Sequence, residues 1–247
     1  MDNLRALAML AGVFFHGALA YSPMLHGLWP AADAQQSPIV DYIVWFTHLF
    51  RMPLFFLIAG FFVAYLVQKR GMGGMLKNRA LRILLPLIIF LPLCMWAVIA
   101  SLLSAVASVQ AKSPVMEMIV TAMANPGTPP PPTALHLWFL YNLVFFCVLT
   151  WVFQYVNWQW LRAYFNRITP VLFLAIFPLL LVPALLSVAA PLPAPDSFLP
   201  QLWSFGFFGL FFALGYWVFS TENFIDLFKS YAFMLLIMSA GLYVVFY

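Results

Sequence analysis

Residues 4–21 read LRALAMLAGVFFHGALAY and set an arginine and a histidine, Arg5 and His16, into the first apolar stretch of the chain. An ionisable side chain is costly in hydrocarbon, so one that persists there marks a candidate functional site. A separation of eleven positions is close to three helical turns. Both side chains are therefore expected on one helix face, about 16 Å apart along the axis. Arg5 would lie near the membrane surface and His16 near mid-depth.

The composition is that of a membrane protein. Of the 247 residues, 65% are apolar and only 7% are charged, against about 25% charged in an ordinary soluble domain. The net charge of +4 does not indicate a nucleic-acid partner, because the basic residues lie in short loops between apolar segments. Cys94 and Cys147 lie inside such segments and are expected to be small core residues rather than a disulfide.

The apolar pattern predicts an all-α fold, a polytopic transmembrane helical bundle with about seven spans of about 20 residues each. We expect one integral-membrane domain over residues 1–247, C-terminally incomplete because the chain stops on an apolar residue. The predicted spans are Leu4–Tyr21, Ile39–Val67, Ile83–Ser108, Leu135–Tyr155, Pro170–Ala190, Gln201–Phe219 and Tyr231–Tyr247.

The loops between the spans indicate the orientation. Basic residues gather in Gln68–Arg82 and Asn157–Thr169, whereas the alternate loops carry few. Because basic loops favour the cytoplasmic side, the N-terminus is expected in the cytoplasm and the C-terminus outside. The external loop Val109–Ala134 contains the proline-rich tract Pro126–Thr133, which is expected to be extended and to shape an outer rim.

His16 is a candidate general base, because neutral imidazole accepts protons near pH 7. A histidine hydrogen-bonded between helices is the alternative interpretation. In the second span, His48 and Arg51 are three residues apart and share a helix face, near the expected depth of His16. Arg51 stays charged, so it must face a partner or a water-filled cavity. Pairing with a backbone carbonyl is its purely structural alternative. Pro53 is expected to kink this span beside an internal cavity.

Two further groups of residues are candidates. Arg79 and Arg82, at i and i+3, would form a double fork suited to phosphate oxygens, although basic residues flanking a span also follow from orientation alone. His136 and Trp138 open the fourth span near its outer mouth, where Trp138 is also an ordinary interfacial aromatic. Asn142 is expected to form a hydrogen bond between helices. We predict no metal site, because no helix carries a histidine pair with ligand spacing.

Four motifs resemble one known family, the membrane-bound acyltransferase family 3. Asp2-x-x-Arg5 followed by His16 resembles the family's opening, and residues 50–62, FRMPLFFLIAGFF, are similar to its second motif. Arg79-x-x-Arg82 before Pro86 is similar to its cytoplasmic Arg-x-x-Arg. Residues 136–140, HLWFL, are most similar to the branch that contains the succinyltransferases of periplasmic glucans. The chain would be a fragment or a short member, since the family usually has more spans.

The resemblance implies acyl transfer across a bacterial inner membrane, from cytoplasmic acyl-CoA to a hydroxyl of an external glycan or similar acceptor. Acyl-CoA would be a co-substrate, with no permanently bound cofactor. His16 would then accept the hydroxyl proton, and Arg51, beside His48, would stabilise the oxyanion. On the donor side, the CoA phosphates would be held by Arg79 and Arg82, with Arg5 contacting CoA or orienting the first span and Asp2 pairing with Arg5.

Three alternatives to the enzyme remain open at this point. A transporter or flippase of acylated or lipid-linked sugars would use a similar polar cavity. An inactive scaffold or fragment would not bind CoA. A haem or quinone redox protein would be coloured or redox-active.

Overall fold

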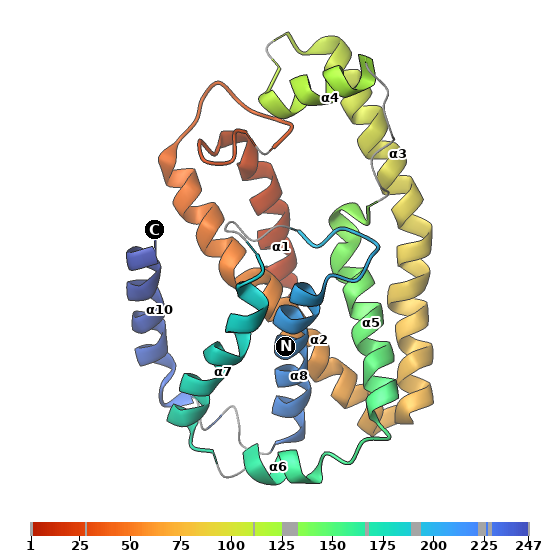
Figure 1. Cartoon of the computed structure of the whole chain (residues 1–247), viewed down its shortest axis with the longest axis vertical. Coiled ribbons are helices and arrows are strands. Elements are labelled where there is room, and N and C mark those ends of the chain that lie inside the picture. The colour runs from red at the N-terminus through yellow and green to blue at the C-terminus, as the bar shows by residue number, and fades with distance from the viewer. Residues whose placement is uncertain are drawn as a thin grey trace. The chain divides into compact units, whose positions relative to one another are not determined.

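The computed structural model of the chain describes residues 2–27, 29–110, 112–124, 133–165, 168–188, 194–221, 226 and 229–246 (Figure 1). Within these ranges the secondary structure is helical, and the one β-type pairing is an isolated bridge between Thr133 and Ser197. The all-α prediction is confirmed. The helices are α1 (Asp2–Ala18), α2 (Pro38–Arg79), α3 (Leu85–Ser108), α4 (Pro114–Ala124), α5 (Trp138–Phe153), α6 (Gln159–Phe165), α7 (Pro170–Leu185), α8 (Leu202–Ser220) and α10 (Ala232–Phe246).

Three helical stretches in the described ranges are long and apolar enough to cross a membrane. They are Pro38–Ser108, which contains both α2 and α3, Leu135–Phe153 and Leu202–Ser220. Shorter apolar helices occupy the remaining predicted spans, at Ala6–Tyr21, Leu172–Leu185 and Ala232–Val245. Every predicted span therefore contains an apolar helix.

The predicted loops are more helical than expected. Gln68–Arg82, predicted as a basic loop, continues α2 to Arg79 and then forms a π-helical turn, η2 (Ala80–Leu84). Helical geometry breaks at Gly71, whose φ of 68° and ψ of 174° lie outside the helical region, so α2 consists of two helices joined across a kink at this glycine. Lysine and arginine are good helix formers, so the basic residues on both sides of Gly71 are helical.

A second predicted loop, Val109–Ala134, contains α4. Ser113 accepts a hydrogen bond from the Met116 N–H through its hydroxyl oxygen at 3.3 Å, and Pro114 occupies the first helical position. Serine followed by proline is a helix-start signal, so the part of the predicted loop at Pro114–Ala124 is a helix. The proline-rich tract lies outside the described residues except for Thr133.

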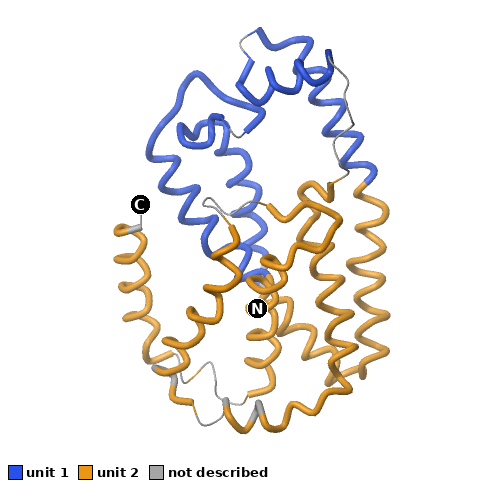
Figure 2. The backbone as a smooth tube through the Cα atoms, in the orientation of Figure 1, with its two compact units in different colours: residues 1–55, 92–132, 247 blue, residues 56–91, 133–246 orange. Residues whose placement is uncertain are grey.

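The chain divides into two compact units, shown in different colours in Figure 2. Unit 1 comprises residues 1–55, 92–132 and 247, and unit 2 comprises residues 56–91 and 133–246. Both long helices pass from one unit to the other close to an internal proline, α2 near Pro53 and α3 at Pro92. Each unit has its own set of packed apolar side chains.

Unit 1 has a small apolar core where the end of α1 meets the start of α2. Phe15, Leu19 and Val44 are buried there, with Leu25 and Trp29 packed against them. The connecting loop closes back on α1 through backbone hydrogen bonds from Asp33 to Ala20 (2.9 Å) and from Ser37 to Tyr21 (3.1 Å). The loop after α1 is therefore fixed over the end of that helix.

Unit 2 is built around close helix contacts and stacked aromatic rings. Phe56 is fully buried, with its ring centroid 5.4 Å from that of Phe146 and 4.9 Å from that of Phe208. The backbones of α2 and α8 touch at two glycines: a Cβ at Gly60 would overlap the Phe212 carbonyl, and a Cβ at Gly215 the Leu57 carbonyl. Helices α7 and α8 lie side by side (Figure 1).

Candidate functional site

In unit 1 three of the predicted site residues gather around one aromatic ring, Phe15 of α1. The His48 ring stacks on Phe15 with centroids 5.3 Å apart, and the His16 ring meets it edge-on at 5.2 Å. The Arg51 guanidinium carbon stands 4.5 Å from the same ring centroid. His48 and Arg51 thus share one face of α2, as their spacing predicts. Phe15, which sequence reasoning did not single out, connects them to His16.

Arg51 is a buried cation with an apolar neighbourhood. It is 8% exposed, and its Nε is buried with no hydrogen-bond partner among the described residues. The guanidinium contacts a ring face, an arrangement that attracts a cation electrostatically, and its tip lies against Gly12 of α1. The described residues supply no carboxylate to it. Arg51 therefore remains a positive charge in a low-dielectric setting, where its field acts strongly on any developing negative charge.

His16 lies at the end of α1 and is covered by the loop that follows. The Trp29 ring stacks on the His16 ring, with centroids 5.7 Å apart and planes inclined by 24°. The backbone around Trp29 is fixed by two hydrogen bonds. The Trp29 backbone N–H donates to the Leu25 carbonyl at 3.0 Å, and the Ser113 hydroxyl donates to the Pro30 carbonyl at 2.7 Å. The imidazole plane of His16 is thus fixed between Phe15 and Trp29.

A buried polar pair anchors the same loop to α2. Ser22 and Asp41 are 1% and 5% exposed, and the Ser22 hydroxyl donates to the Asp41 carboxylate. The Leu25 N–H donates to the Ser22 hydroxyl at 3.2 Å. A carboxylate near a helix N-terminus is electrostatically favourable. Asp41 was not predicted as a site residue, although an acid at the start of an apolar helix is a signal for such an anchor.

The two arginines of the Arg-x-x-Arg motif have different surroundings in unit 2. Arg79 ends α2 half-buried, with Nε and one terminal nitrogen shielded from solvent. Arg82 lies in the π-helical turn and is exposed. A π turn has more residues per turn than an α-helix, so i and i+3 no longer align. The arrangement differs from the double fork predicted with α-helical geometry.

His136 is presented on a short turn at the start of α5. It is exposed in the 3₁₀ turn η3 (Leu135–Leu137), and Leu135 before it has a φ of 47°, which non-glycine residues rarely adopt. The turn is fixed by the Ala134 N–H, which donates to the Asp196 carbonyl at 2.6 Å. A strained residue held by its surroundings is a sign of a functional turn.

Trp138 and Asn142 belong to the interior of unit 2. The Trp138 ring lies 5.3 Å from Phe208 and 6.2 Å from Phe56, so it is part of the aromatic core. The Asn142 side chain donates to the Ser204 hydroxyl at 2.7 Å, and both residues are buried. The predicted interhelical hydrogen bond of Asn142 is confirmed.

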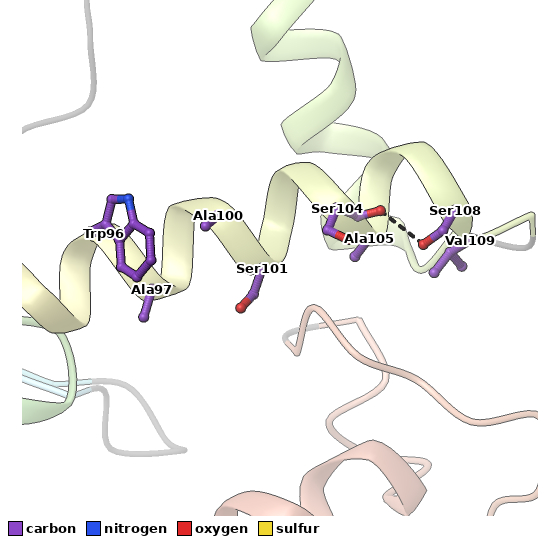
Figure 3. A pocket seen from close by; sticks show the side chains of 8 residues that line it. All are labelled: Trp96, Ala97, Ala100, Ser101, Ser104, Ala105, Ser108 and Val109. Atoms are coloured by element: carbon purple, nitrogen blue, oxygen red, sulfur yellow. Dashed lines mark hydrogen bonds between the residues drawn. The ribbon is translucent and has the colours of Figure 1, made fainter.

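Other predictions fall outside these clusters. Asp2 and Arg5 lie on α1, but their side chains are not among those described. The cavity expected beside Arg51 stays a prediction. An open groove of about 580 Å³ follows one face of α3, lined by small residues between Trp96 and Val109 (Figure 3). Such side chains permit close approach of another helix. Cys94 and Cys147 are both free thiols, as expected. The described residues contain no cluster of metal-ligating side chains.

Comparison with known proteins identifies the family. The family model of the acyltransferase domain matches residues 1–247. Glucans biosynthesis protein C of Escherichia coli, from strains SMS-3-5 and HS among others, is 33% identical over 93 residues. That stretch is 38% of this chain and 23% of each relative, so the match covers about a quarter of the relatives' length. No solved structure matches. Because the family model spans the whole chain, this protein belongs to the acyltransferase domain family.

Proposed function

We propose that this chain carries the reaction centre of a membrane O-acyltransferase, with acyl-CoA as donor and a glycan hydroxyl as acceptor. The observation that carries the proposal is the contact of one ring, Phe15, with both a histidine and a buried arginine. Acyl transfer to a hydroxyl needs a proton acceptor and a positive charge near the developing oxyanion. Membership of the acyltransferase domain family and the glucan-related name of the relatives support the same assignment.

In the proposed reaction the acceptor hydroxyl gives its proton to His16 as its oxygen attacks the thioester carbonyl carbon. The negative charge that develops on the carbonyl oxygen is stabilised by Arg51. The tetrahedral intermediate collapses with cleavage of the C–S bond, and the CoA sulfur leaves with the proton held by His16. Trp29 and Phe15 keep the imidazole in one plane through these steps, which lowers the cost of orienting it.

The donor phosphates are assigned to the basic segment at the end of α2. Arg82 is exposed and free to meet phosphate oxygens from solvent, while Arg79 contributes positive charge from beside α5. Arginine binds phosphate through charge-assisted hydrogen bonds. The acceptor is proposed to reach His16 from the end of α1 opposite the N-terminus.

The test compares two histidines of unit 1. His16→Ala is expected to lower acylation by about 10²-fold to 10⁴-fold, the usual contribution of a general base. His26→Ala is the matched control, because His26 lies in the loop, where its ring is paired with the Gln36 side chain. Mass spectrometry of envelope glycans from cells expressing each variant at equal membrane abundance measures the acylated fraction.

Each outcome has a defined meaning. Acylation that requires the chain and His16 but survives His26→Ala supports the proposal. Equal acylation with wild type and His16→Ala would show that His16 is not the base, and the same glycans with and without the wild-type chain contradict the enzyme. Sugar export that depends on the chain and survives His16→Ala favours a transporter.

A further inference from the structure

We propose that Gly12 is a positioning residue for Arg51, and that the absence of a side chain at this place on α1 sets where the buried guanidinium stands. The proposal rests on the role of Arg51 in the proposed function. Phe15 and Gly12 are three residues apart, so they face the same side of α1. Together they form the surface against which Arg51 packs: the guanidinium lies over the face of the Phe15 ring, and Gly12 has no side chain that would occupy the space beside it.

The geometry at Gly12 is specific. A Cβ at this position would lie 2.9 Å from the Arg51 Nη1 atom and 3.8 Å from both its Cδ and its Cζ. Such a contact to Nη1 is too short, so one of the two partners must move. The terminal nitrogen of a flexible side chain moves more easily than a helix backbone. An added methyl group at Gly12 is therefore expected to displace Arg51 and to leave α1 in place.

The glycine has no other evident use in the structure. It lies inside α1 and does not adopt a positive φ, which in the described residues is found at Leu135 and Gly71. Glycine in a helix interior is less favourable than alanine, so the local helix gains nothing from it. Gly17, on the same helix and next to His16, has no atom within 4 Å of its would-be Cβ. Of the two glycines, Gly12 alone has Arg51 beside it.

Displacing Arg51 would change the reaction rate, because the stabilisation that a buried charge gives to the oxyanion depends on the distance between them. The guanidinium has no carboxylate among the described residues to hold it. It lies over the Phe15 ring and beside Gly12. A shift of about 1 Å in a catalytic group can lower a rate by about 10²-fold. Gly12 would thus control the rate without touching a substrate.

The experiment compares Gly12→Ala with Gly17→Ala in the full chain, using the glycan acylation assay and thermal unfolding of the purified protein in detergent. Gly12→Ala is expected to lower the initial acylation rate by about 10²-fold while its Tm stays equal to or above that of wild type. Gly17→Ala is expected to keep the wild-type rate with a similar gain in Tm. A lower rate with higher stability cannot come from misfolding.

A double-mutant comparison tests whether Gly12 acts through Arg51. Arg51→Lys removes Nη1, so adding Gly12→Ala to it is expected to cause no further loss. A full additional loss would overturn the proposal, as would a Gly12→Ala variant that retains the wild-type rate or one that loses stability. These results are separable from failure of the proposed function, in which acylation would not depend on His16 at all.

Discussion

At the scale of single residues, the site depends on an aromatic ring that carries no chemistry of its own. Phe15 contacts both histidines and Arg51, and it is 7% exposed, whereas its neighbour Phe14 is 59% exposed. The polar residues of the site could be predicted from the sequence, because ionisable residues are rare in an apolar run. The choice between the adjacent Phe14 and Phe15 could not, since it depends on which face of α1 meets α2.

Phe15→Leu is expected to lower the acylation rate by about 2-fold to 30-fold, because loss of the cation–π contact, about 0.5–2 kcal/mol, frees Arg51 to move. Leucine keeps most of the apolar volume, so the protein should still fold. Phe14→Leu is the matched control and should leave the rate unchanged. Equal rates for the two variants, measured by glycan acylation at equal expression, would contradict a central role for Phe15.

The i, i+3 spacing occurs in two pairs of site residues, His48 with Arg51 and Arg79 with Arg82, and the two pairs lie in different helical geometry. The i, i+3 rule held for the first pair because α2 is regular around it. It does not apply in the same way to the second pair, because the π-helical turn η2 starts at Ala80, and the double fork stays a prediction. A π turn leaves no clear mark in composition, so the sequence predicted the residues of the motif but not their orientation.

At the scale of elements, α4 is the main addition to what the sequence predicted. Its start is marked by Ser113 and Pro114, signals that could have been recognised within the supposed loop. Ser113 also donates to the Pro30 carbonyl, next to the tryptophan that covers His16. One hydroxyl thus caps α4 and ties it to the loop over the site.

Ser113→Ala should expose both roles. Loss of the helix cap costs about 0.5–2 kcal/mol, so hydrogen–deuterium exchange is expected to rise at the amides of residues 115–117, in the first turn of α4, and at Trp29 and Ala31. Ser108→Ala is a suitable comparison, because its hydroxyl donates only to the Ser104 carbonyl within α3. An exchange pattern in residues 29–31 that matches wild type would show that Ser113 does not hold the loop.

The glycine contacts between α2 and α8 bring the two helix backbones together in unit 2. Gly60→Ala and Gly215→Ala each place a methyl group into a backbone carbonyl, which cannot move without separating the helices. A loss of at least about 3 kcal/mol is expected, measured as aggregation or a large fall in Tm in detergent. Gly241→Ala on α10, with nothing within 4 Å, should behave like wild type. A stable Gly60→Ala protein would refute the tight contact.

The apolar helices themselves were predictable, because a run of about 20 apolar residues has few structural options in a membrane. Their partners were not. The packing of α2 against α8 brings together Leu57, Gly60 and Gly215. A glycine in the sequence does not indicate which helix it will contact. The extent of α2 beyond Val67 was also missed, since hydropathy reports where lipid ends and not where a helix ends.

At the scale of the whole molecule, the four motifs that indicated a family were sufficient to identify it, and the family model extends over all 247 residues. The proposed reaction centre lies within unit 1, on α1 and the first part of α2, and the Arg-x-x-Arg segment lies in unit 2. The motifs lie on segments that follow one another along the chain, α1, α2 and η2, in the order that indicated the family.

The glycine contact between α2 and α8 also has a consequence for biosynthesis. The ribosome completes α2 at Arg79 and reaches the start of α8 at Leu202 about 120 residues later, and synthesis at roughly 5–20 residues per second makes that interval about 6–25 seconds. During this time the face of α2 at Gly60 has no α8 to meet and is covered by lipid or by the insertion machinery. The newly made chain therefore passes through an unfinished state whose end is set by translation, before the tight contact of unit 2 can form.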